Sequence, residues 1–261
     1  MFTRFQNCTP TGATEDQTFG FGKAWSALVT QYCRLGITNK TDLLPALSGL
    51  AQHVEYLNPG QYIAGLWERD ISFLLGWKVR QYAFKRQFAD LNYPTFSWIS
   101  APAGIYWPYN EPVIPKCVLV SATCHAATEN PYGHIIDCSI RIQGHLLPGS
   151  RFFALSLSPR HESHFEWYRY RLIFTLDNKP IPEQRSYPLL HSDWDFLAVL
   201  GLFHTKQEPP QKMKEEAIYR VVGLMLRRNQ KDGTYSRLGI VEGIPMSWFE
   251  EFATKEVVTL V

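Results

Sequence analysis

Residues 62–78 read Y-I-A-G-L-W-E-R-D-I-S-F-L-L-G-W-K, and residues 94–100 read P-T-F-S-W-I-S. In the first segment apolar residues recur near the spacing of one helical face, with Glu68, Arg69 and Asp70 grouped on the first turn. Pro94 ends any helical continuation, and the run after it has extended character. We therefore expect a helix in the first segment and a hinge at which a helical half meets a β-rich half.

The chain before this hinge also has helical spacing. Residues 1–22 are polar and rich in Gly and Thr, which predicts an irregular arm. A first helix is expected over residues 25–34, with Gly36 placed to cap it. A second helix begins at Thr41 or Asp42 and tolerates Pro45 in its first turn. The face of the first helix that we expect to be buried consists of Trp25, Leu28, Val29 and Tyr32.

After the hinge the pattern is that of strands. Turn signals lie at residues 130–133 and at residues 229–233, and a short helix is expected over residues 246–252. In one strand Ile136, Cys138, Ile140 and Ile142 are predicted to share a face. The expected strands cover residues 113–128, 135–146, 151–158, 168–178, 194–204, 217–228 and 235–243.

This order of elements predicts one α+β domain over residues 1–261. Its helical half, residues 23–92, is expected to pack on a β-rich half, residues 93–261. We expect the β-rich half to form an antiparallel β-sheet or a partly closed β-barrel.

The composition describes an ordinary globular protein. The 261 residues are 45% hydrophobic and 19% charged, with a formal net charge of +2. This balance excludes a disordered chain, and the lack of a basic stripe argues against nucleic-acid binding. Five cysteines without a C-x-x-C pair, and no secretory signal, predict reduced thiols and a cytoplasmic location. The longest apolar run, residues 194–203, is only about ten residues and too short to span a bilayer.

Motifs that would fix a chemistry are missing. The sequence contains no G-x-S-x-G, G-x-G-x-x-G or G-x-x-x-x-G-K-[ST] motif, so we expect neither a serine hydrolase nor a nucleotide-binding protein, and no cofactor. His161 and His164 are one residue short of the H-E-x-x-H spacing, so we expect an exposed loop and no metal site.

Three groups of residues remain as candidates for a site, each with a structural alternative. Tyr106, Trp107 and Tyr109 form a Pro-bracketed aromatic loop that would suit an apolar ligand or pack as a connector. His191, with Asp193 and Trp194, would serve as an acid–base pair or form a polar turn before a strand. The third group, from the hinge, consists of Arg69, Trp67 and Trp98. Arg69 would polarise a ligand or lie on a helix surface, and the two tryptophans would contact a ligand or belong to the core.

Several blocks along the chain resemble one family. These are residues 43–51 (L-L-P-A-L-S-G-L-A), 62–70, 74–77, 94–100, 140–148 and 223–240. In this order they are similar to the C-terminal region of fungal heterokaryon-incompatibility (HET) domain proteins, with Phe96 in place of the first tryptophan of the usual P-S-W-S-W-A-S. The resemblance implies a filamentous fungus as the source. Because the chain begins shortly before the match, we expect it to lack the N-terminal TIR-like signalling domain.

Two functions are consistent with this sequence. The first is a cofactor-independent cyclase or isomerase of fungal secondary metabolism, such as a Diels-Alderase-like enzyme, that holds an apolar terpene- or polyketide-like substrate in a reactive conformer. Tyr106, His191 and Arg69 would be catalytic, and the other candidates would bind substrate. The second is a HET-related protein-interaction or incompatibility module without catalytic activity. An enclosed apolar cavity is expected for the enzyme, and an exposed apolar patch for the module. The sequence leaves the oligomeric state open.

Overall fold

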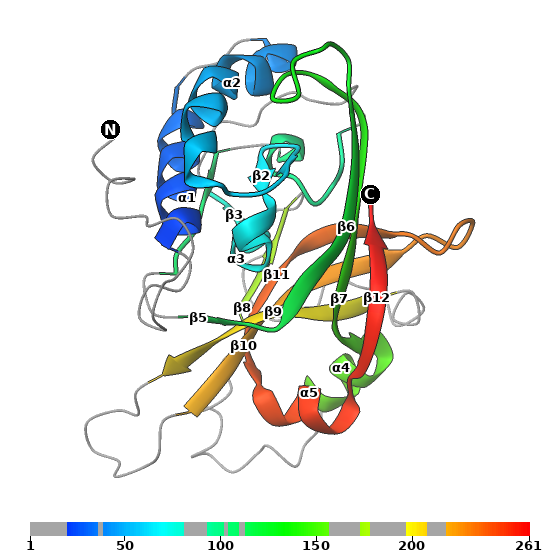
Figure 1. Ribbon diagram of the computed structural model, residues 1–261. Coiled ribbons are helices and arrows are strands. Elements are labelled where there is room, and N and C mark those ends of the chain that lie inside the picture. Colours follow the sequence, from blue (N-terminus) through cyan, green and yellow to red (C-terminus); the bar gives the residue numbers. More distant parts are fainter. Residues whose placement is uncertain are drawn as a thin grey trace.

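The computed structural model describes residues 20–35, 39–80, 93–101, 104–109, 113–156, 173–177, 197–207 and 218–261. Within these ranges short helices come first and long strands follow (Figure 1). The predicted α+β class, with an N-terminal helical segment packed on a C-terminal sheet, is therefore confirmed. Most of the expected N-terminal arm lies outside the described residues.

The helices are α1 (Gly20–Tyr32), α2 (Leu43–Val54), α3 (Ile71–Leu74), α4 (Gly149–Ser156) and α5 (Met246–Phe252). The strands are β1 (Tyr62–Ile63), β2 (Leu66–Trp67), β3 (Lys78–Val79), β4 (Ile105–Tyr106), β5 (Val113–Pro115), β6 (Cys117–Ala126), β7 (Ile135–Pro148), β8 (Ile173–Leu176), β9 (Leu197–Gln207), β10 (Ile218–Arg228), β11 (Tyr235–Pro245) and β12 (Thr254–Leu260). Short 3-10 turns cover Lys40–Asp42, Glu55–Leu57, Glu68–Asp70 and Trp98–Ser100.

The first two helices form where their apolar spacing predicts them. The four residues that we expected on the inner face of α1 are all buried. Asp42 precedes α2 in the N-cap position, although its side chain makes no capping hydrogen bond. At the start of α1 the backbone N–H of Gly22 instead donates to the carboxylate of Asp70, at 2.5 Å. Asp70 is therefore buried against a helix N-terminus and does not lie on a helix surface.

The helix expected in residues 62–78 is wrong over most of its length. These residues form the two-residue strands β1 and β2, a 3-10 turn and the single-turn helix α3. The reason lies at Ala64 and Gly65, which connect β1 to β2 with φ values of 49° and 91°. Two positive φ values make a tight hairpin turn, which is incompatible with a right-handed helix.

Gly65 lies at the centre of the helical half. Its carbonyl oxygen accepts hydrogen bonds from the indole N–H groups of both Trp25 and Trp98, each at 2.9 Å. Trp67 follows in β2, and its ring contacts the rings of Trp25 and Tyr62 at 5.8 and 4.9 Å between centroids. The hairpin thus places one hydrogen-bond acceptor inside an aromatic cluster. Through the Gly65 carbonyl it connects α1 to the segment of Trp98.

Among the described residues, the large sheet contains eight strands. Seven are hydrogen-bonded in the order β5-β9-β10-β11-β12-β7-β6, and β8 pairs with β11. The pairs are antiparallel except for one parallel bridge between Tyr235 and Leu260. Residues 146–148 of β7 also pair with β9. The sequence of pairings through β9, β10, β11, β12 and β7 therefore returns to β9, so the sheet curls back on itself.

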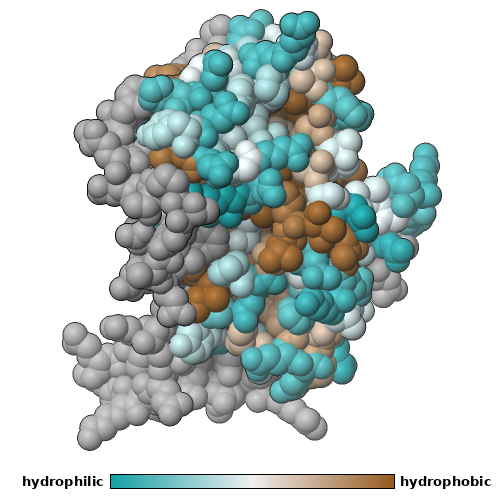
Figure 2. Space-filling view, in the orientation of Figure 1, coloured by the Kyte–Doolittle hydropathy of each residue, from teal (hydrophilic) through white to brown (hydrophobic). Residues whose placement is uncertain are grey.

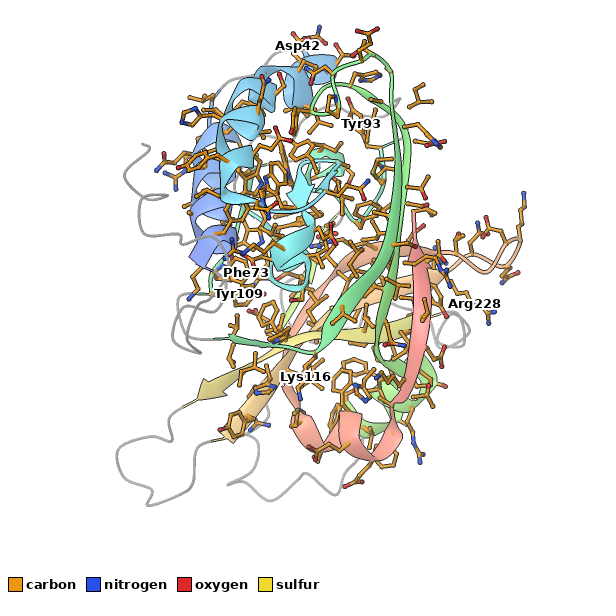
Figure 3. All side chains as sticks on the ribbon, in the orientation of Figure 1. Asp42, Phe73, Tyr93, Tyr109, Lys116 and Arg228 are labelled. Carbon is orange, nitrogen blue, oxygen red and sulfur yellow. A yellow bond between two sulfur atoms is a disulfide. The ribbon has the colours of Figure 1, made fainter. Side chains whose placement is uncertain are left out.

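The sheet has a hydrophobic core on each face. Residues of β9 alternate between these two cores. Leu200 and Leu202 lie on the face of the helical half, and Leu197 and Val199 lie on the face of α4 and α5. Figure 3 shows side chains filling the space between the helical half and the sheet, where the labelled Phe73 and Tyr109 lie together. Their rings meet edge to face at 6.4 Å between centroids.

The second core explains why the strand expected over residues 151–158 is wrong. This segment lies largely in α4, where the adjacent residues Phe152 and Phe153 are both buried. Two neighbouring residues of a strand point to opposite faces, whereas neighbouring residues of a helix can both face one core. The Phe152 ring contacts the ring of Trp248 in α5 at 5.9 Å between centroids.

The β6–β7 hairpin corrects two further expectations. A register shift next to Ile135 leaves Ile136 unpaired and 67% exposed, so Ile136 does not share the buried face of Cys138. Cys124 lies directly opposite Cys138, with their Cα atoms 4.1 Å apart, and the two form a disulfide. The expectation that all cysteines are reduced is therefore wrong for this pair, while Cys33 and Cys117 are buried and lie outside it.

Apolar side chains are also exposed on the long strands. Figure 2 shows one hydrophobic group over β6, β7 and β12 on a mainly hydrophilic face. Val118, Val120 and Val257 on these strands are 57%, 48% and 41% exposed. Val118 and Val257 are both register partners of Gln143 in β7. These three valines are called the valine patch below.

Candidate functional site

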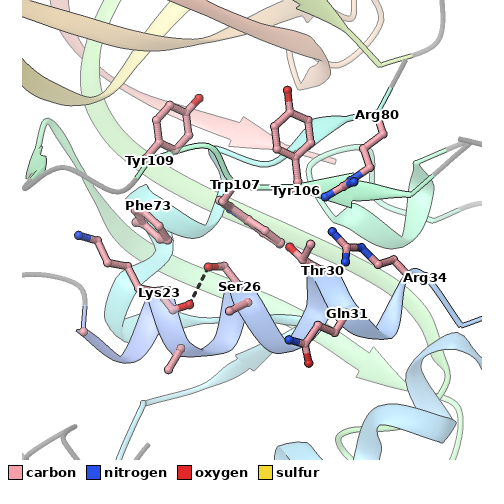
Figure 4. A pocket seen from close by; sticks show the side chains of 13 residues that line it. Lys23, Ser26, Thr30, Gln31, Arg34, Phe73, Arg80, Tyr106, Trp107 and Tyr109 are labelled. Atoms are coloured by element: carbon pink, nitrogen blue, oxygen red, sulfur yellow. Dashed lines mark hydrogen bonds between the residues drawn. The ribbon is translucent and has the colours of Figure 1, made fainter. Parts of the chain in front are cut away.

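A groove of about 700 Å³ lies between α1 and the segment that carries β4 (Figure 4). It is open to solvent, and its walls are mixed, with aromatic rings on one side and polar side chains on the other. The lining residues are Gly20, Lys23, Ala24, Ser26, Ala27, Thr30, Gln31, Arg34, Phe73, Arg80, Tyr106, Trp107 and Tyr109. A second cavity in the described part of the chain lies beside α5 and measures about 80 Å³.

The helix wall follows from the spacing of residues in α1. Lys23, Ala27 and Thr30 of α1, and Arg34 in the turn that follows it, recur at helical intervals and are half-buried or exposed. The opposite face carries the aromatic and aliphatic residues of the core. Since Trp25 is bonded to Gly65, the rotation of α1 about its axis is fixed. The four spaced residues therefore point into the groove as one row.

The second wall is built by the short pair β3–β4. Lys78 and Val79 pair with Tyr106 and Ile105, and the backbone N–H of Arg80 donates to the carbonyl of Gly104. Trp107 donates its indole N–H to the carbonyl of Leu74 at 3.1 Å. These bonds position one arginine and a tryptophan edge opposite α1.

Tyr109 ends this wall and joins it to the sheet. Its ring packs edge to face on Phe203 of β9 at 4.9 Å between centroids. Burial, together with the nearby carboxylate of Glu242, raises the pKa of Tyr109 well above its ordinary value. Glu242 is itself paired with Lys78 at 2.5 Å. Tyr109 is therefore a neutral phenol at physiological pH and anchors the wall.

The described lining carries positive charge and no carboxylate. Its cations are Lys23, Arg34 and Arg80. Figure 4 shows the guanidinium groups of Arg34 and Arg80, from opposite walls, directed toward the same end of the groove, next to Thr30. Arg80 also stacks over the ring of Tyr106, with its Cζ 5.4 Å from the ring centroid. This end of the groove suits an anion that has a planar neighbouring group.

The structure brings some of the predicted site residues together. Tyr106, Trp107 and Tyr109 line the groove as one aromatic wall. Arg69 does not line it, because its side chain reaches the carbonyl of Leu57. Trp67 and Trp98 are 1% and 0% exposed, so their assignment as ligand-contacting residues is corrected to core residues. His191, Asp193 and Trp194 lie outside the described residues.

Sequence reasoning missed the polar half of the groove. Lys23, Thr30 and Arg34 repeat at helical spacing on the outer side of α1, a pattern that also describes any solvent-facing helix surface. Arg80 follows directly after β3 and carries no motif. The signal that would have found them is the pairing of β3 with β4, which is visible only in three dimensions.

No group of three or more His, Cys, Asp or Glu side chains is placed to hold a metal ion within the described ranges. Among the helices described, none has the length and apolar character needed to cross a bilayer. Comparison of the chain with protein-family models, curated proteins and solved structures found no match.

Proposed function

We propose that this protein is a recognition module that binds a small organic ligand in the groove between α1 and residues 104–109. The observation that carries the proposal is the open groove of about 700 Å³ with an aromatic wall facing a polar helix. Such a volume falls within the range of ligand sites, which combine apolar walls with a few placed polar groups. The valine patch offers a separate contact surface for a protein partner.

Binding is favoured over catalysis because the groove is open and polar on one side. A cyclase that acts through shape needs a cavity that surrounds its substrate and excludes water. The resemblance to the C-terminal region of HET proteins stays a prediction, and it agrees with a module that recognises a ligand or partner.

The second candidate is the cofactor-independent cyclase or isomerase. One observation favours it: Arg80 lies over the ring of Tyr106, so a guanidinium and a phenol flank the same space. Together they could polarise a carbonyl of an unsaturated substrate. His191 and Asp193, the expected acid–base pair, lie outside the described residues.

The test is ligand capture with a blocked groove as the comparison. The purified chain is incubated with a fungal small-molecule extract, separated from unbound compounds, and analysed by mass spectrometry. Ala27→Trp fills the groove from α1, whereas Gln52→Trp changes an exposed position of α2. We expect one or more compounds to be retained by the parent and by Gln52→Trp, and to be lost from Ala27→Trp. Equal retention by all three proteins would contradict binding in the groove.

The same samples distinguish the two candidates. A recognition module returns the captured compound unchanged after hours of incubation. A cyclase or isomerase returns a compound of the same mass with a different retention time, without any added cofactor.

A further inference from the structure

We propose that the ligand of this groove carries an oxyanion, a carboxylate or a phosphate, joined to a planar unsaturated or aromatic body. The oxyanion binds between Arg34 and Arg80, and the planar body lies against Tyr106 and Trp107. This inference rests on the proposed binding function of the groove and adds the chemical class of its ligand.

The first argument is charge. Arg34 lies in the turn just after α1, in line with the groove-facing row of that helix, and Arg80 follows β3 on the opposite wall. Neither guanidinium has an ion pair with any residue that the structure describes, and the described lining contains no carboxylate. Two like charges directed toward one space repel each other unless an anion lies between them. Their arrangement therefore favours an anionic ligand over a neutral one.

The second argument is geometry. A guanidinium presents paired N–H donors in one plane, which match the two oxygens of a carboxylate or phosphate. Thr30 lies beside the two arginines in Figure 4 and can add a hydroxyl donor. The backbone of Arg80 is fixed by its bond to Gly104, so its side chain begins from a defined point on the wall.

The third argument is the surface next to the arginines. Tyr106 and Trp107 are half-buried, and each presents part of its ring to the groove. The Trp107 ring is held by its hydrogen bond to Leu74. A planar group attached to the oxyanion can therefore stack on a fixed aromatic wall. Its contribution to the binding free energy is then of the size measured for other aromatic pairs.

Matched probes test the proposal on the full chain. They are 1-naphthoate, 1-naphthyl phosphate and 1-naphthalenemethanol, which share one ring system and differ in charge, and inorganic phosphate alone. Equilibrium dialysis at low salt measures their affinity. We expect both naphthyl anions to bind at least about tenfold more tightly than the alcohol, and more tightly than inorganic phosphate. The ratio between carboxylate and phosphate identifies which oxyanion the site prefers.

Variants locate the effect. Arg34→Gln and Arg80→Gln should each weaken the naphthyl anions about tenfold while leaving the alcohol unchanged. Arg80→Lys should recover only part of the loss, because an ammonium lacks the planar donor pair. Arg151→Gln, on α4 and over the ring of Phe252, is the control cation outside the groove. Unfolding curves check that each variant is folded.

The outcomes separate the two proposals. If the alcohol binds as tightly as the anions, or if the groove variants behave like Arg151→Gln, the anionic ligand class is wrong while the groove remains a binding site. If none of the four probes binds and the capture experiment also retains nothing, both proposals are wrong.

Discussion

At the scale of single residues, Gly65 is a position where a side chain meets both backbone strain and a steric clash. Its φ of 91° lies in the region that favours glycine, and an added Cβ would lie 2.5 Å from Nε1 of Trp98. Its carbonyl is the shared acceptor of two buried indoles. One residue thus fixes the hairpin turn, the depth of Trp98 and the rotation of α1.

Gly65→Ala is predicted to destabilise the protein by about 2 to 5 kcal/mol, because backbone strain and a steric clash add together. Gly49→Ala is the matched control, since Gly49 lies in α2 with nothing within 4 Å of the added methyl group. That change should be neutral or stabilise by up to about 1 kcal/mol through helix propensity. Urea unfolding followed by circular dichroism gives both values. Similar free energies for the two variants would contradict the assigned role.

His204 of β9 gives a prediction about pH. Its side chain is buried, its Nδ1 has no hydrogen-bond partner in the described part of the chain, and its ring meets that of Tyr219. Burial, with a smaller contribution from Lys116, lowers the pKa of His204 from its ordinary value of 6.5. The unfolded chain therefore binds a proton at a pH where the folded chain does not. The stability that depends on neutral His204 is fully present above pH 6.5. It is lost as the pH drops through the folded-state pKa of His204.

His204→Gln should remove this part of the acid dependence, because glutamine does not titrate. The measurement is the free energy of unfolding in urea between pH 7.5 and pH 5. His53→Gln, at an exposed position of α2, is the control and should keep the slope of the parent. A slope that His204→Gln leaves unchanged would show that another group is responsible.

At the scale of elements, β11 is tied to the helical half through Arg237. This side chain is fully buried, donates to Asp177 at 2.7 Å, and lies over the Trp77 ring at 3.3 Å from its centroid. It also donates to the carbonyls of Leu75 and Trp77, which follow α3. One guanidinium therefore satisfies acceptors from two other parts of the chain, and Lys78–Glu242 adds a second link between the same elements.

Arg237→Met should cost about 3 to 5 kcal/mol of stability, since it leaves a buried carboxylate and two carbonyls without their donor. Arg141→Met changes an exposed arginine of β7 and should stay within about 0.5 kcal/mol of the parent. Combining Arg237→Met with Asp177→Leu should cost less than the two single changes added together, which measures the coupling of the pair. Strict additivity would mean that the two side chains do not interact.

The elements also show how far the sequence could predict this fold. Long strands with alternating residues, such as β7, β10 and β11, and the helix α2 were visible because one local pattern governs each. The hairpin at residues 62–67 could not be predicted from the sequence, because its apolar residues fit a helical period. The positive φ values of Ala64 and Gly65, which prevent a helix, are seen only in the structure. β12 was missed because its residues 254–257 are exposed, and it is held by pairing with β7.

The candidate site was half visible for the same reason. The aromatic wall is continuous in sequence, so residues 106–109 stood out as a loop. The cationic end is assembled from Arg34, two residues beyond α1, and Arg80 after β3, which are 46 positions apart and come together only when β3 pairs with β4. Neither residue carries a local pattern that separates a ligand-binding arginine from one on an ordinary surface.

At the scale of the whole molecule, the two halves share one core. The main cluster includes Leu47 of α2 and Leu224 of β10, and both are 0% exposed. Tyr132, at the tip of the β6–β7 hairpin, reaches Tyr62 of the helical half at 5.3 Å between ring centroids. Because neither half can bury its apolar face without the other, we expect them to unfold together.

Leu47→Ala and Leu224→Ala are predicted to cost about 2 to 5 kcal/mol each through the cavities that they create. In a single cooperative unit, each change lowers the urea midpoint of tryptophan fluorescence and of far-ultraviolet circular dichroism by the same amount. Fluorescence reports mainly on the helical half, where Trp25, Trp67 and Trp77 are buried, and dichroism also reports on the sheet. Val257→Ala, in the exposed valine patch, is the control and should move neither midpoint appreciably. If Leu47→Ala moved the fluorescence transition alone, the helical half would be an independent folding unit, and the groove on it could be studied without the sheet.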